Sequence, residues 1–155
     1  MHDTRAKNAY KKAERANAEL RRGGHVMLRL NNGEAALFRG AEFADAEDIN
    51  FLSRTAGSGP LLVLTANRVK SLQRSLRQGW PAATVALAAH HYEQVFDLAF
   101  GQTRLDDNCG LSLVAERSGS LADHATRLLR NAKLLPAALM ARLPFRDIVV
   151  QDRFA

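Results

Sequence analysis

The sequence predicts one α/β domain, layered in the α+β manner, in which helices cover a mixed sheet. Helix-like and strand-like segments alternate along the chain with short loops between them, which is typical of layered α/β folds. Residues 61–64 and 137–141 are uninterrupted apolar runs of strand length, as expected for strands covered on both faces. The 155 residues suit a single domain, 1–155, and no repeat or long linker divides them.

The N-terminal part predicts a helix followed by a hairpin. Small and apolar side chains share one face of residues 3–22 at helical spacing, and the glycine pair that follows ends this helix. Residues 25–30 and 35–38 read as strands. The Asn-Asn-Gly sequence between them is a strong turn signal, because Asn and Gly tolerate a positive φ.

The middle of the chain predicts further helices and strands. Asp45, with Asp48 three residues later, forms a weak capping box at the start of a helix. Thr65 follows the apolar run at 61–64 and caps the next helix. Further elements are expected at residues 84–88 (strand), 93–100 (helix) and 111–115 (strand).

The C-terminal part predicts an amphipathic helix that leads into a buried strand. Asp123 lies near the start of the helix, where a carboxylate suits the helix dipole, and Pro136 ends it. The strand at 137–141 follows at once, which suggests half of a βαβ unit. Residues 148–150 are expected to form a last edge strand. Five residues share the apolar face of the helix: Ala125, Leu128, Leu129, Ala132 and Leu135.

Composition and charge exclude several classes of protein. Hydrophobic residues make up 46% of the chain and charged residues 25%, and no apolar run approaches the roughly 20 residues that cross a bilayer. The polar N-terminus has no apolar secretory segment, and a single cysteine, Cys109, allows no disulfide within the chain. We therefore expect a cytoplasmic protein without a membrane partner. The net charge is +6, but the aromatic residues are not interleaved with the basic ones, so nucleic acid is not the expected partner.

The residues alone indicate no strong catalytic or metal site. His90 and His91 are adjacent and cannot share a helix face, so we interpret them as exposed loop histidines. Cys109 has no neighbouring histidine or cation in the sequence that would activate it, so an inert thiol is expected. The glycines at 57 and 59 precede a strand instead of a helix, and they therefore indicate a turn and not a phosphate loop.

Four segments nevertheless resemble, in the same order, the 3,4-dihydroxy-2-butanone 4-phosphate synthases, which are riboflavin-pathway enzymes acting on ribulose 5-phosphate. The resemblance implies their fold and a homodimer. It covers most of the chain, although the middle is shorter. The matching residues are Ala41-Glu42 with Ile49-Asn50-Phe51, Leu64-Thr65 with Arg68, the segment 111–121, and Ala132 with Leu135-Pro136-Ala137.

The resemblance also implies where the chemistry would lie, and most of those positions have changed. The two metal-ligand positions, a Glu and a His in the family, fall on Asn32 and Leu121. The Glu that closes the last strand falls on Arg142, and an Asp of the loop falls on Ala36. Glu34 keeps one acid, and Asp123 replaces another Glu with conserved charge. Leucine offers no donor atom, and a neutral amide replaces a carboxylate poorly. We therefore predict that the family's Mg²⁺ site is lost, that no cofactor is bound and that synthase activity is absent.

Three functions remain open from the sequence. The first is a pseudoenzyme, a silent synthase-like domain that supports or regulates riboflavin chemistry together with GTP cyclohydrolase II, since degenerate domains of this kind occur at that enzyme's N-terminus. The second is a lyase of the ribulose 5-phosphate type with altered chemistry, in which Arg68, Arg117 or Arg142 binds phosphate. The third is a module that binds nucleic acid or an acidic partner through the basic N-terminal helix.

Residual catalytic groups would have to come from few positions. His124 lies one helical turn from the lost histidine position and could replace it. Glu34 and Asp123 are the acids that the resemblance leaves near it. These three residues are therefore the candidates for any remaining acid–base chemistry.

Overall fold

The computed structural model describes residues 2–56, 59–72, 79–87, 95–101 and 113–143. From the N-terminus, the elements are α1 (His2–Arg21), β1 (Val26–Arg29), β2 (Ala35–Gly40), the 3-10 helix η1 (Ala41–Phe43), α2 (Ala46–Ala56), β3 (Leu61–Thr65), α3 (Ala66–Ser71), β4 (Ala82–Ala86), α4 (Val95–Phe100), β5 (Leu113–Glu116), α5 (Leu121–Asn131) and β6 (Ala138–Leu143).

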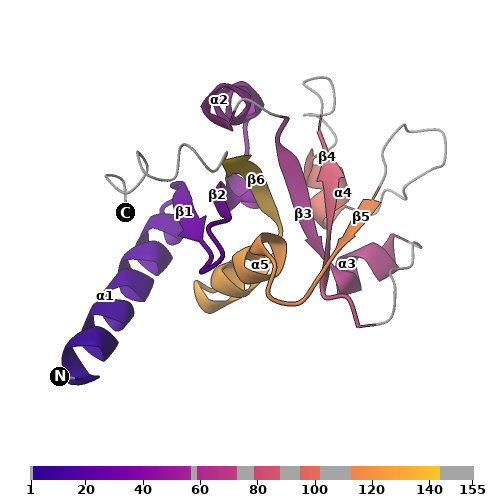
Figure 1. Cartoon of the computed structure of the whole chain (residues 1–155). Helices are drawn as coiled ribbons and strands as arrows, with labels where there is room; N and C mark the ends of the chain where they lie inside the picture. The colour runs from indigo at the N-terminus through magenta and orange to yellow at the C-terminus, as the bar shows by residue number, and fades with distance from the viewer. Residues whose placement is uncertain (1, 57–58, 73–78, 88–94, 102–112, 144–155) are drawn as a thin grey trace.

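The described strands form one six-stranded sheet in the order β1-β2-β6-β3-β4-β5 (Figure 1). The layered fold of helices on a sheet is confirmed. The expected mixture of parallel and antiparallel pairs is not found, because every described pairing is antiparallel. β2 and β3 run in the same direction, but β6 lies between them and is antiparallel to both. The predicted βαβ unit is likewise absent, because α5 connects β5 to β6, which run in opposite directions with β4 and β3 between them.

The first two strands form the predicted hairpin. The turn is closed by bonds between Leu30 N and Glu34 O at 2.8 Å and between Gly33 N and Leu30 O at 3.0 Å. Gly33 has a φ of 96°, which a residue without a Cβ adopts at little cost. The Asn32 side-chain oxygen accepts a hydrogen bond from Glu34 N at 2.9 Å. The Asn32 side chain therefore stabilises the turn to which it belongs.

Each face of the sheet carries its own hydrophobic core. Side chains alternate along β6, so that Leu139 packs in one core and Met140 in the other. Residues of α2, α3 and α4, such as Leu52, pack in the first core. The second core contains residues of α5 together with Leu20 from the end of α1. α5 therefore lies on the face opposite to α2, α3 and α4.

The start of α5 is fixed by two hydrogen bonds that join Asp123 to the turn before the helix. Asp123 N donates to the Ser120 hydroxyl at 3.2 Å, and the Asp123 carboxylate accepts from Gly119 N at 2.8 Å. The helix ends at Asn131, earlier than the expected stop at Pro136. Lys133 adopts a φ of 64°, and this left-handed residue turns the chain before the proline is reached.

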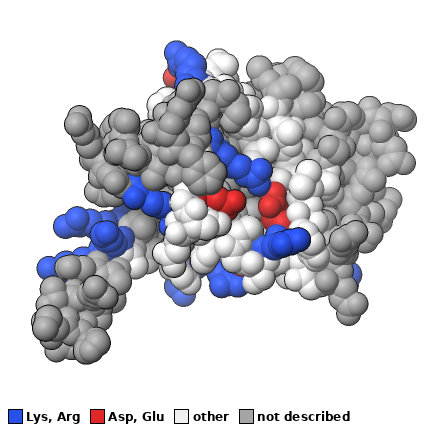
Figure 2. Space-filling model, viewed as in Figure 1, with Lys and Arg blue, Asp and Glu red and all other residues white. Residues whose placement is uncertain are grey.

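α1 is confirmed as a helix and extends away from the sheet (Figure 1). Leu20 is fully buried, and the Arg21 side chain donates to Ala132 O at 3.1 Å. By contrast, residues 11–15 are exposed, and Figure 2 shows Lys and Arg side chains along this part of the molecule. The helix is thus attached to the domain at its C-terminal end.

Some predicted elements are confirmed with shifted bounds, and other predictions concern residues outside those that the structure describes. β4, α4 and β5 confirm the strand, helix and strand expected in the middle of the chain, with bounds shifted by about two residues. The expected edge strand at 148–150, the histidines His90 and His91, and Cys109 lie outside the described residues. No described helix is both long enough and apolar enough to cross a membrane.

A buried ion pair joins the loop between α1 and β1 to β2 and α2. Asp48 is 4% exposed, and its two carboxylate oxygens lie 2.8 and 2.9 Å from Arg39 Nη1. Arg39 Nη2 donates to Gly23 O, and the Asp48 carboxylate also accepts from Asp45 N at 2.9 Å. In return, Asp48 N donates to the Asp45 side chain at 3.0 Å, which confirms the predicted capping box. This pair therefore ties the end of α1 to the start of α2.

The half-buried His25 ring beside this pair should make stability depend on pH. Burial lowers the pKa of His25 below 6.5, Arg39 lowers it further, and the nearby carboxylates, of which Asp48 acts most strongly, raise it in part. Between the folded pKa and 6.5 the unfolded chain binds more protons, so the stability contributed by neutral His25 is lost as pH falls through this range. We expect His25→Gln to reduce the drop in unfolding free energy between about pH 7.5 and about pH 5.5. Denaturant titrations of both proteins test this, and an unchanged drop would contradict it.

A candidate ligand pocket at the ends of β5 and β6

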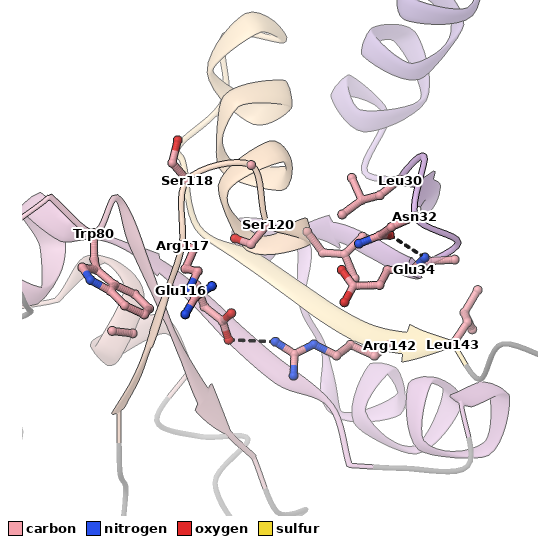
Figure 3. A pocket seen from close by; sticks show the side chains of 14 residues that line it. Leu30, Asn32, Glu34, Trp80, Glu116, Arg117, Ser118, Ser120, Arg142 and Leu143 are labelled. Atoms are coloured by element: carbon pink, nitrogen blue, oxygen red, sulfur yellow. Dashed lines mark hydrogen bonds and ion pairs between the residues drawn. The ribbon is translucent and has the colours of Figure 1, made fainter.

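A cavity of about 650 Å³ lies where the β1–β2 hairpin, the ends of β5 and β6 and the N-terminus of α5 meet (Figure 3). The hairpin supplies Asn32 and Glu34, and β6 supplies Arg142. Leu121 comes from the first turn of α5. The structure thus brings into one cavity four positions that the resemblance placed in the site, although they come from three segments that lie far apart in the sequence.

An ion pair crosses this cavity. Glu116 Oε1 accepts from Arg142 Nη2 at 2.7 Å and from the Thr84 hydroxyl at 3.0 Å. The Glu116 side chain is only 15% exposed, whereas that of Arg142 is 50% exposed. β5 and β6 are not neighbours in the sheet, so the pair spans the two strands between them. It holds a guanidinium group in a defined position at the cavity (Figure 3).

A second cation, Arg117, lines the same cavity. The Arg117 guanidinium carbon lies 5.9 Å from the centre of the Trp80 ring, which is within range of a cation–π contact. Both residues line the cavity, together with Ser118 and Ser120 from the turn before α5. In the space-filling view, acidic and basic side chains meet near the middle of the visible face (Figure 2).

The three candidates for acid–base chemistry occupy different environments. Glu34 lines the main cavity. Asp123 is 3% exposed, and besides Gly119 N its carboxylate contacts Arg127 Nη2 at 3.0 Å, so it is engaged in capping and pairing. His124 lines a smaller neighbouring cavity of about 430 Å³ beside the hairpin. The structure therefore does not gather the three groups into one site.

Arg68, the third arginine proposed to bind phosphate, lies elsewhere. Its guanidinium donates to the carbonyl oxygens of Leu98 at 2.8 Å, Asp97 at 2.9 Å and Gly101 at 2.6 Å. Partial burial lowers the pKa of Arg68 from its ordinary value, yet an arginine remains charged. These three carbonyl groups lie at the C-terminal end of α4, so Arg68 stabilises the C-terminus of that helix.

Replacing Arg68 with Met should therefore affect stability. The variant loses hydrogen bonds from a charged donor to three carbonyls, and we expect the free energy of unfolding to fall by about 2 kcal/mol. Denaturant unfolding measures this change. Lys70→Met, at an exposed position two residues away, is the matched control and should change stability by less than about 0.5 kcal/mol. Equal effects of the two substitutions would contradict the capping role.

Sequence reasoning assigned no role to Trp80 and Glu116, which line the pocket, or to Thr84, which donates a hydrogen bond to Glu116. Thr84 lay in a strand whose alanines made it ambiguous, and Trp80 lay in a loop. Glu116 had no expected role, although an acid beside Arg117 at the end of a strand was a usable signal. Among the residues that the structure describes, no group of three or more His, Cys, Asp or Glu side chains could hold a metal ion.

Solved structures with the same architecture identify the fold. A two-domain 3,4-dihydroxy-2-butanone 4-phosphate synthase from A. baumannii matches 92% of this chain and 53% of its own length, with a TM-score of 0.67 at 17% identity. The synthase of Candida albicans matches 91% of this chain and 89% of its own, with a TM-score of 0.64 at 17% identity. The chain has the fold of the 3,4-dihydroxy-2-butanone 4-phosphate synthases. The resemblance seen in the sequence is thereby supported at the level of the fold.

A sequence relative connects this synthase fold to a second enzyme. GTP cyclohydrolase-2 from Azospirillum brasilense is 30% identical in an alignment of 138 positions that covers 86% of this chain. The chain spans about a third of that relative, because the match covers 35% of it. No family profile matches the sequence. A further solved synthase, 16% identical with a TM-score of 0.59 over 84% of this chain and 74% of its own, is described in complex with two magnesium ions.

Proposed function

We propose that this chain is a catalytically silent synthase-like domain that acts alongside GTP cyclohydrolase II in riboflavin biosynthesis, as a scaffold or a regulator. The observation that carries the proposal is the ion pair between Arg142 and Glu116. It puts a fixed positive charge into the cavity in which the synthase resemblance expects a divalent cation and acidic groups.

The donor atoms of the cavity do not fit a magnesium ion. Mg²⁺ prefers carboxylate and water oxygens in octahedral geometry. The metal-ligand positions implied by the resemblance carry the amide of Asn32 and the hydrocarbon side chain of Leu121. The Glu116 carboxylate is already neutralised by Arg142 at 2.7 Å, and that guanidinium would repel a nearby cation. Without a metal, and with the three acids expected at Asn32, Ala36 and Arg142 replaced, the synthase reaction lacks its electrostatic support.

The cyclohydrolase relative supports the second half of the proposal. The region of similarity is 86% of this chain but 35% of the relative, so that protein contains a large part that this chain does not match. A silent synthase-like domain beside a cyclohydrolase can act through its surface, as a scaffold or a regulator. By the resemblance we also propose a homodimer, and light scattering after size-exclusion chromatography measures the mass directly.

The test combines an activity assay with a binding assay. We expect no consumption of ribulose 5-phosphate in the presence of Mg²⁺ above a protein-free control, and no saturable heat when Mg²⁺ is titrated into the protein. We expect co-elution with GTP cyclohydrolase II or a change in its rate of GTP turnover. Magnesium-dependent consumption of ribulose 5-phosphate would refute the silent-domain proposal, and lack of any effect on the cyclohydrolase would refute the partnership.

A further inference from the structure

A groove of about 500 Å³ lies between α1 and the edge strand β1. β1 is the first strand in the sheet order, so it has β2 on one side and no strand of the described chain on the other (Figure 1). The helix wall includes Lys12, Arg15 and Glu19, and the strand wall includes Val26 and Met27. The groove shares none of its described lining residues with the cavity at the ends of β5 and β6, so it is a separate surface.

The backbone of Met27 points toward the open edge of the sheet. Leu30 N donates to Glu34 O at 2.8 Å, and the register between β1 and β2 is constant from there back to Val26. In an antiparallel pair, only every second residue bonds to the neighbouring strand. Counting back from Leu30, the next residue to bond is Leu28, so the N–H and C=O groups of Met27 point away from β2. No described residue is bonded to these two groups, and they can therefore pair with an added strand.

The helix wall of the groove carries positive charge that the described residues do not neutralise. Lys12 and Arg15 are exposed, and no acid in the described part of the chain lies within ion-pair distance of either. Glu19, which also lines the groove, is already paired with Arg22. Figure 2 shows Lys and Arg side chains along this part of the molecule. The groove is therefore complementary to a negatively charged partner.

We propose that this groove binds an extended acidic segment of a partner protein, which adds to the sheet beside β1. The backbone of the segment pairs with Met27, its carboxylates meet Lys12 and Arg15, and the partly exposed Val26 gives it an apolar neighbour. A nucleic acid fits less well, because it has no strand backbone and the described lining contains no Phe, Tyr or Trp on which a base could stack. The inference goes beyond the proposed function, since it assigns a surface and a mode of binding whether or not the partner is a cyclohydrolase.

Short synthetic peptides test this mode of binding. The probe is a fluorescein-labelled peptide in which Glu and Val alternate, and fluorescence anisotropy measures its affinity for the whole chain. We expect saturable binding with a dissociation constant on the order of 0.1 mM, weakening as the salt concentration rises. The same peptide with Lys in place of Glu should not bind. Two versions of the Glu–Val peptide carry N-methyl groups at alternate residues, and the version whose methyl groups face β1 should bind at least about fivefold more weakly, because it cannot donate to Met27 O.

Two variants of the protein test the two walls. Met27→Pro removes the outward N–H group but keeps the bonds to β2, and Lys12→Gln/Arg15→Gln removes both charges. Each should weaken binding of the Glu–Val peptide at least about fivefold. Lys70→Gln/Arg130→Gln makes the same change of charge at exposed positions outside the groove and should leave the affinity unchanged. Circular dichroism measures whether Met27→Pro folds. If it does not, the charge variant and the N-methylated peptides still decide the question.

Several outcomes would overturn this inference. Equal binding of the Glu and Lys peptides, unaltered binding of both N-methylated versions, or no saturable binding up to about 1 mM peptide would each do so. Tighter binding of single-stranded oligothymidine than of the Glu–Val peptide would assign the groove to nucleic acid instead. A change in the mass of the protein alone by light scattering in either groove variant would make this edge an interface between copies of the chain. None of these results bears on synthase activity or Mg²⁺ binding, so failure of this inference is distinguishable from failure of the proposed function.

Discussion

Replacing Asp48 with Ala is expected to lower the free energy of unfolding by about 3–5 kcal/mol, because it removes one partner of a buried ion pair. Asp48 is 4% exposed, and its carboxylate accepts from Arg39 and from Asp45 N. The variant would leave the Arg39 side chain, which is 16% exposed, with a charge that neither water nor a carboxylate fully solvates. A domain of this size has about 5–15 kcal/mol of total stability. A loss of 3–5 kcal/mol should therefore shift the denaturant midpoint strongly.

Two comparison variants identify the cause of this loss. Asp45→Ala removes the exposed half of the same capping box and should cost only about 1 kcal/mol. The double variant Arg39→Met/Asp48→Leu removes both charges and should recover a large part of the stability lost in Asp48→Ala. If Asp48→Ala cost no more than Asp45→Ala, the buried pair would not be the interaction that joins α1 to α2.

The parts of the fold that could be predicted are those in which neighbouring residues decide the structure. The β1–β2 turn depends on an Asn-Asn-Gly sequence, and both capping boxes join residues three or four positions apart. The sheet order could not be predicted in this way. β6 forms at the end of the described chain and inserts between β2 and β3, so its two neighbours are fixed by long-range packing.

The pocket shows the same division between local and distant information. Glu116 and Arg142 lie 26 positions apart on strands that are not neighbours, and nothing local indicates that they meet. The resemblance to the synthases placed Asn32, Leu121 and Arg142 in one site, and the structure brings them to one cavity. The sequence also suggested Arg68 as a phosphate ligand. The structure instead shows Arg68 bonded to the end of α4, a contact between distant residues that no sequence motif indicates.

Rebuilding the metal site should produce the largest functional change. The triple variant Asn32→Glu/Leu121→His/Arg142→Glu restores the residue types that the synthase resemblance implies at positions which all line the cavity. It also removes the guanidinium that neutralises Glu116. We expect the variant to bind Mg²⁺ with a dissociation constant on the order of 1 mM or lower, whereas the natural chain should show no saturable binding. Calorimetric titration of both proteins measures this difference.

The triple variant is informative only if it folds, and the main risk lies at one position. Leu121 is 5% exposed and belongs to the core beneath α5, so a histidine there introduces a polar ring into an apolar site. Circular dichroism and the thermal midpoint of Leu121→His alone measure that cost separately. If the folded triple variant bound Mg²⁺ no better than the natural chain, the three positions would not form the implied coordination sphere. If the natural chain itself bound Mg²⁺ tightly, the pair between Arg142 and Glu116 would have to open for the cation, and the case for a silent domain would fail.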